Sequence, residues 1–119
     1  MAGSKKSRGT TLEGLRAIAL DLPEVHERSV HGTPGFYVSK KLFALVLKDE
    51  HSIVVWMDLN HRAAMLKKAP EVFSITPHYD KHPMVIVQLA NVGKTQLRDL
   101  LVASWQQRAP RRLSRSLEE

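Results

Sequence analysis

The sequence predicts an α+β fold in which an antiparallel β-sheet packs against helices near the two ends of the chain. Two observations predict it. Apolar residues recur at helical spacing in segments that include Leu15 and Leu97. Between these segments, runs rich in β-branched and aromatic residues alternate with turn-forming residues, which is typical of strands joined by hairpins. A chain of 119 residues fits one domain with a single core.

The composition narrows the class of protein. With 43% hydrophobic and 25% charged residues, the chain falls in the ordinary range of globular domains. It has no cysteine, which excludes disulfides, thiolate nucleophiles and cysteine-ligated metals. No apolar run approaches the roughly 18 residues that a membrane span requires. We therefore expect a cytoplasmic protein with no membrane partner.

The net charge of +6 comes mainly from the two ends of the chain. The bases in these ends are Lys5, Lys6, Arg8, Arg108, Arg111, Arg112 and Arg115. Elsewhere bases and acids nearly balance. We expect a disordered basic tail over residues 1–9, one folded domain over residues 10–113 and a disordered tail over residues 114–119.

The first helix is predicted to begin at a capping box, because Thr10 and Glu13 have Thr-x-x-Glu spacing. Pro23 ends it. The buried face is expected to consist of Leu15, Ile18, Ala19 and Leu22.

Residues 26–57 are predicted to form an antiparallel meander of about three strands. The apolar runs are residues 36–38, 42–47 and 52–57, and residues 39–41 form a tight turn. The last two runs are almost continuously apolar, which indicates central strands with a well-covered face.

A helix over residues 59–69, a strand over residues 84–89 and a last helix ending before Pro110 complete the prediction. Asp58 is the expected N-cap of the residue 59–69 helix. Its expected buried side is Leu59, Ala63 and Leu66, whereas Arg62, Lys67 and Lys68 should face water. The last helix should bury a stripe of Leu97, Leu100, Leu101, Ser104 and Trp105.

No motif predicts catalysis or metal binding. His78 and His82 are four residues apart, but Pro77 and Pro83 bracket them, which favours a loop, and no third ligand lies at a motif spacing. His26 and His31 should lie on opposite faces of a strand. The segment at residues 93–95 resembles the end of a P-loop, yet the required earlier glycine is absent, so it should begin a helix. We expect no metal, no cofactor and no enzyme activity.

Several segments, in this order, resemble the MmcQ/YjbR family of small bacterial proteins over residues 12–113. They are L-R-A-I-A-L-D-L-P-E-V-H-E, H-G-T-P-G-F-Y-V, K-L-F-A-L, A-P-E-V-F-S-I-T-P-H-Y-D, V-I-V-Q-L and L-R-D-L-L-V-A-S-W. The resemblance implies an antiparallel sheet packed against N- and C-terminal helices, with a further helix after the meander. It also implies a role in DNA binding, since family members are commonly labelled that way.

Nucleic-acid binding is therefore the leading hypothesis, and a protein-interaction or self-associating module is the alternative. The sequence favours no particular oligomeric state. Phosphate contacts are expected from Lys40, Lys41, Lys81, Arg108, Arg111 and Arg112. Stacking or loop contacts are expected from His78 and Tyr79, with Trp56 as a further aromatic candidate.

Overall fold

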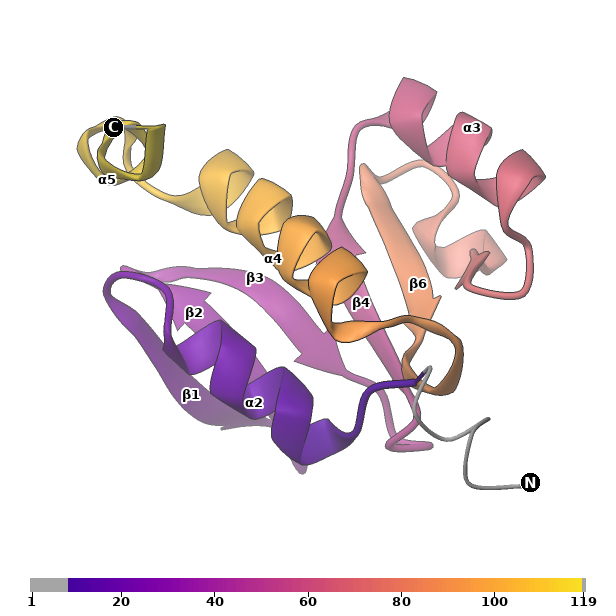
Figure 1. Ribbon diagram of the computed structural model, residues 1–119, viewed down its shortest axis with the longest axis horizontal. Coiled ribbons are helices and arrows are strands. Elements are labelled where there is room, and N and C mark those ends of the chain that lie inside the picture. The colour runs from indigo at the N-terminus through magenta and orange to yellow at the C-terminus, as the bar shows by residue number, and fades with distance from the viewer. Residues whose placement is uncertain (1–8, 119) are drawn as a thin grey trace.

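The structure, a computed structural model, describes residues 9–118. A six-stranded antiparallel sheet forms one layer, and helices α2 and α4 lie across one face of it (Figure 1). The predicted α+β fold is confirmed. In chain order the elements are α2 (Leu12–Leu20), β1 (Val25–Val30), β2 (Thr33–Val38), β3 (Lys41–Val46), β4 (Ser52–Trp56), α3 (Leu59–Lys68), β5 (Phe73–Ser74), η1 (Pro77–Tyr79), β6 (Met84–Gln88), η2 (Leu89–Asn91), α4 (Lys94–Arg108) and α5 (Arg111–Glu118).

The strand order is β1-β2-β3-β4-β6-β5, so hairpins join the first four strands and β6 returns beside β4. The meander contains one strand more than the sequence indicated, namely β1. Its residues V-H-E-R-S-V lie at the sheet edge and its four inner positions are all exposed. Because four consecutive residues of β1 are exposed, the strand lacks the apolar alternation from which a strand is usually predicted.

Helix α2 begins one residue later than a capping box at Thr10 would place it. The hydroxyl of Thr11 accepts the N–H of Gly14 at 3.0 Å, so Thr11 is the N-cap. The Thr10 hydroxyl instead donates to the carbonyl of Val92 at 2.8 Å, which ties the start of α2 to the segment before α4. Leu15 and Ala19 of the predicted face are fully buried.

Helix α4 carries the predicted stripe, and its buried residues are Leu97, Leu100, Leu101, Ser104 and Trp105. The helix starts at Lys94, so the P-loop-like segment begins a helix, as expected. Trp105 is the largest fully buried side chain, and its indole N–H donates to the carbonyl of Pro23 at 3.1 Å. This bond fixes the C-terminal half of α4 against the end of α2.

The turn between β3 and β4 is held by one carboxylate. Asp49 accepts the backbone N–H groups of His51 and Ser52 at 2.8 and 3.0 Å and the Ser52 hydroxyl at 2.9 Å. The pKa of Asp49 therefore lies below its ordinary value, chiefly because of the hydrogen bond from the His51 N–H. Glu50 in this turn has a φ of 62°.

The C-terminal end differs from the expectation. Helix α5 runs through residue 113, where the domain was expected to end, and continues to Glu118 in place of a disordered tail. Leu113 is 7% exposed and belongs to the core, which gives α5 an anchor. Residues 1–8 of the expected basic tail and residue 119 lie outside the described residues. Within residues 9–118, no helix is long and apolar enough to cross a membrane.

Candidate functional site

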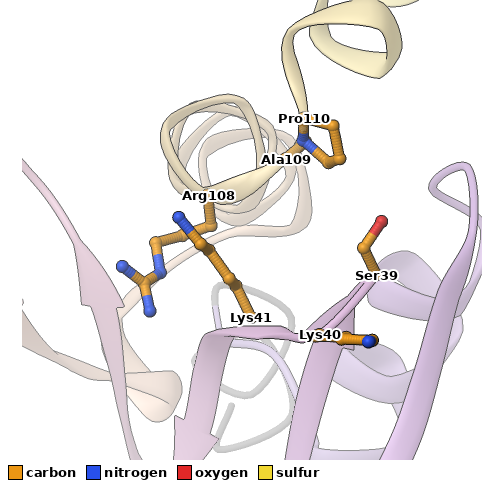
Figure 2. Close-up of a pocket in the computed structure, with 6 residues that line it drawn as sticks. All are labelled: Ser39, Lys40, Lys41, Arg108, Ala109 and Pro110. Atoms are coloured by element: carbon orange, nitrogen blue, oxygen red, sulfur yellow. The ribbon is translucent and has the colours of Figure 1, made fainter.

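Cations gather where the β2–β3 hairpin meets the junction of α4 and α5. A hollow of about 380 Å³ lies there, lined by Ser39, Lys40, Lys41, Arg108, Ala109 and Pro110. Figure 2 shows these residues coming from the hairpin on one side and from the end of α4 on the other. Arg111 and Arg112 follow Pro110 directly in α5. We call the five residues Lys40, Lys41, Arg108, Arg111 and Arg112 the basic corner.

The hairpin fixes the two lysines. Val38 of β2 pairs with Lys41 of β3, which leaves Ser39 and Lys40 as the turn. Ser39 has a φ of 54°, a left-handed conformation that lets the chain reverse within two residues. Lys40 and Lys41 are both exposed, as predicted for a hairpin tip.

Arg108 is held by two contacts that place it at the base of this hollow. Its Nε donates to the carbonyl of Leu42 at 2.9 Å, and its guanidinium lies 4.3 Å from the centroid of the Trp56 ring. Burial lowers the pKa of the Arg108 guanidinium, which still remains charged at neutral pH. Arg108 also covers part of Trp56, so this ring is a poor candidate for stacking on a base.

Arg111 and Arg112 of α5 are exposed, but the helix that carries them is held in place. Arg112 forms a 3.4 Å ion pair with Glu24, which lies just before β1. Arg111 lies beside it, at the first position of the helix. Since Leu113 packs in the core, both arginines belong to an anchored helix rather than to a tail.

Three of the predicted contact residues lie away from the basic corner, namely His78, Tyr79 and Lys81. They lie in the segment that leads from η1 to β6, and β4 separates β6 from the hairpin strand β3. The rings of His78 and Tyr79 contact each other edge to face, with centroids 4.8 Å apart. The structure therefore brings Lys40, Lys41 and Arg108 together around the hollow, with Arg111 and Arg112 following in α5, and leaves the loop of Lys81 outside the basic corner.

The prediction that Arg62 faces water is wrong. Arg62 is 7% exposed and donates hydrogen bonds to four backbone carbonyls of the η1–β6 segment, those of Tyr79, Asp80, His82 and Met84, at 2.8 to 3.1 Å. The loop carbonyls, rather than a carboxylate, satisfy the guanidinium. Leu59, predicted to be buried, is instead 48% exposed, because α3 turns its Arg62 side toward the loop.

An aromatic group that the sequence did not predict lies on the opposite face of the sheet from α2. The ring of His26 in β1 stacks on Tyr37 of β2, with centroids 5.6 Å apart and an interplanar angle of 11°. The guanidinium of Arg28 lies 5.7 Å from the centroid of the same Tyr37 ring. The two-residue spacing of His26 and Arg28 places both on one face of a strand, and this signal becomes readable once β1 is recognised.

The other face of β1 is used for packing. Glu27 forms a two-pronged ion pair with Arg16 of α2, at 2.8 and 3.0 Å. The hydrogen bonds from Arg16 are the main reason that the pKa of Glu27 lies below its ordinary value. Because Glu27 points toward α2, its neighbours His26 and Arg28 point away from the helices.

The part of the chain that the structure describes contains no cluster of side chains suited to bind a metal ion. No group of three or more His, Asp or Glu side chains in residues 9–118 is placed to hold an ion. His31, the other histidine considered with His26, lies in the β1–β2 turn with a φ of 52° rather than in a strand.

Comparisons with known proteins give a family and a fold. The YjbR family model matches residues 20–107. Uncharacterized proteins of Mycobacterium tuberculosis and Mycobacterium bovis are 36% identical over 50 residues, which is 42% of this chain and 39% of each relative's length. The crystal structure of Deinococcus radiodurans protein DR2400, assigned to domain family DUF419, is 23% identical and superposes with a TM-score of 0.70, covering 86% of this chain and 80% of that one.

Proposed function

The chain belongs to the YjbR family, and we propose that it is a non-enzymatic protein that binds DNA through the basic corner. The single observation that carries the proposal is the convergence of the hairpin residues Lys40 and Lys41 with Arg108 of α4 around one hollow (Figure 2). These residues are far apart in the sequence. Their meeting creates a local positive charge that the nearly neutral rest of the domain lacks.

The corner suits phosphate groups better than it suits catalysis. Lysine ammonium and arginine guanidinium groups are the side chains that bind nucleic-acid phosphates. Among the ion pairs that the structure describes, the one at this corner joins Arg112 to the carboxylate of Glu24. The hollow is lined by no carboxylate or imidazole that could act as a general base, which supports binding rather than a reaction.

The anchoring of these cations also supports a defined surface. Lys40 and Lys41 sit on a tight hairpin, and α5 is pinned through Leu113. Fixed charges lose less conformational entropy on binding than charges on free tails. We expect contacts to the backbone, with little reading of base sequence.

The proposal is tested by fluorescence anisotropy with a labelled DNA duplex of random sequence. The variant Lys40→Glu/Lys41→Glu should bind at least about ten-fold more weakly, because two phosphate contacts become repulsive. A matched control is Lys67→Glu/Lys68→Glu, which makes the same change in net charge on exposed residues of α3. An equal loss of DNA affinity in both variants would show that binding depends only on net charge. That result would contradict a specific binding site at the basic corner.

A protein-interaction module is the second candidate, and one surface favours it. A groove of about 270 Å³ between α3 and α4 is lined in part by Trp56, Met65 and Leu100. Leu59 at the start of α3 is 48% exposed. On this alternative, self-association measured by light scattering should weaken in Leu59→Ser and be unaffected by Lys40→Glu/Lys41→Glu.

A further inference from the structure

The aromatic group of β1 and β2 has a geometry suited to stacking. His26 and Tyr37 are directly opposed in the β1–β2 register, and their rings are nearly parallel at 11°. Arg28, two residues along β1, adds a guanidinium 5.7 Å from the Tyr37 centroid. Two planar rings and a planar cation thus form one continuous set of π-faces, which we call the stacking patch.

The stacking patch is open to solvent. His26 and Arg28 are exposed and Tyr37 is half-buried, whereas its strand neighbours Phe36 and Val38 are fully buried on the helix side. Helices α2 and α4 both lie on the other face of the sheet (Figure 1). The outer side of the His26 imidazole is therefore accessible to a ligand.

The stacking patch lies near the end of β2 that leads into the hairpin of the basic corner. Tyr37 precedes Lys40 by three residues, a separation of about 10 Å along a strand. Arg112 of the corner pairs with Glu24, which lies two residues before His26. The cations and the rings thus lie on opposite faces of the sheet but at the same end of β1 and β2, so a flexible strand passing around this end can contact both.

We infer that the preferred ligand of the stacking patch and the basic corner together is single-stranded nucleic acid, with an unpaired base stacked on the His26–Tyr37 pair while the basic corner holds nearby phosphates. The inference rests on the proposed function and specifies its substrate. Base faces are hidden inside a duplex, so only an unpaired strand gains this contact. Stacking on aromatic residues tolerates any base, which matches a surface with few groups to read base edges.

The test compares a single-stranded oligonucleotide carrying a central 2-aminopurine with the corresponding duplex. The full-length protein should bind the single strand at least about five-fold more tightly, the lower end of one stacked base. Fluorescence of 2-aminopurine should fall on binding, because the base becomes stacked. His26→Ala should reduce the single-strand affinity to that of the duplex and abolish the fluorescence change, with duplex affinity unchanged.

Two further variants keep the test specific. Tyr37→Phe retains the ring and should behave as the unaltered protein, while His61→Ala removes an exposed histidine from α3 and should have no effect. Equal affinity for single strand and duplex, or equal behaviour of His26→Ala and His61→Ala, would overturn the inference. In that case duplex binding that is weakened by Lys40→Glu/Lys41→Glu would leave the proposed function standing. Absence of binding to either nucleic acid would overturn both.

Discussion

The hydroxyl of Ser104 in α4 accepts the backbone N–H of Trp56 in β4 at 2.9 Å. The same hydroxyl donates to the carbonyl of Phe43 in β3 at 2.6 Å. Pairing between β3 and β4 runs only from Val46 and Ile53 to Ala44 and Val55. One side chain of α4 therefore replaces the sheet hydrogen bonds where the two strands separate, and Arg108 does the same for the Leu42 carbonyl one helical turn later.

Ser104→Ala should lower the free energy of unfolding by about 1–3 kcal/mol, because one buried and one partly buried backbone group lose their partner. Urea denaturation measures this loss. Ser29→Ala makes the same chemical change at an exposed position of β1 and should stay within about 0.5 kcal/mol of the unaltered protein. Equal values for the two variants would show that the bridge does not stabilise the strands.

Arg62→Met should destabilise the protein by at least about 2 kcal/mol, since four loop carbonyls lose a charged donor. The η1–β6 segment should then become the first site of proteolytic cleavage. Arg98→Met, at an exposed position of α4, is the matched control and should have neither effect. Cleavage elsewhere, with the loop still protected, would contradict the role assigned to Arg62.

The ion pair between Arg16 and Glu27 should make a small, pH-dependent contribution to stability. The pKa of Glu27 in the folded protein lies below its ordinary value of 4.5, so the contribution is present above that pH and is lost as the pH falls through the folded-state pKa. Both side chains are partly exposed, so water screens the pair, and Glu27→Gln should cost no more than about 1 kcal/mol at neutral pH. Thermal denaturation should show this difference narrowing below pH 4.5; a difference that grows on acidification would contradict the assignment.

Leu113→Ala tests whether α5 is anchored. The substitution should cost about 2 kcal/mol, the low end for a buried leucine, because the residue lies in the terminal helix. It should also weaken DNA binding, as the α5 arginines lose their fixed position. Leu20→Ala removes a leucine that is 42% exposed and should have a smaller effect on stability and none on binding. DNA affinity unchanged in Leu113→Ala would exclude α5 from the interface.

The sequence was sufficient to predict the elements whose apolar pattern matches their burial. The stripe of α4 from Leu97 to Trp105 and the almost continuously apolar β4 are both central to the core. Strand β1 was not predicted because four consecutive exposed residues at the sheet edge give no apolar pattern. Arg62 was assigned to water by its charge, since no local signal reveals that a loop some 20 residues later supplies carbonyls to bury it.

The individual cations of the candidate site could be predicted from the sequence, but their proximity in the fold could not. Lys40 and Lys41 follow from the hairpin turn, Arg108 from the end of the predicted last helix, and Arg111 from the basic C-terminal end of the chain. Their proximity depends on how α4 crosses the sheet, which is a long-range property of packing. The separation of Lys81 from this group depends equally on β6 pairing with β4 rather than with β3.

The most direct test of the central claim is the salt dependence of duplex binding between about 50 and 200 mM salt. The logarithm of the affinity should fall linearly with the logarithm of the salt concentration, by about 0.9 for each phosphate that the protein neutralises. Lys40→Ala/Lys41→Ala should reduce that slope by roughly two, whereas Lys67→Ala/Lys68→Ala should leave it unchanged. The same slope and affinity in both variants would contradict phosphate binding at the basic corner.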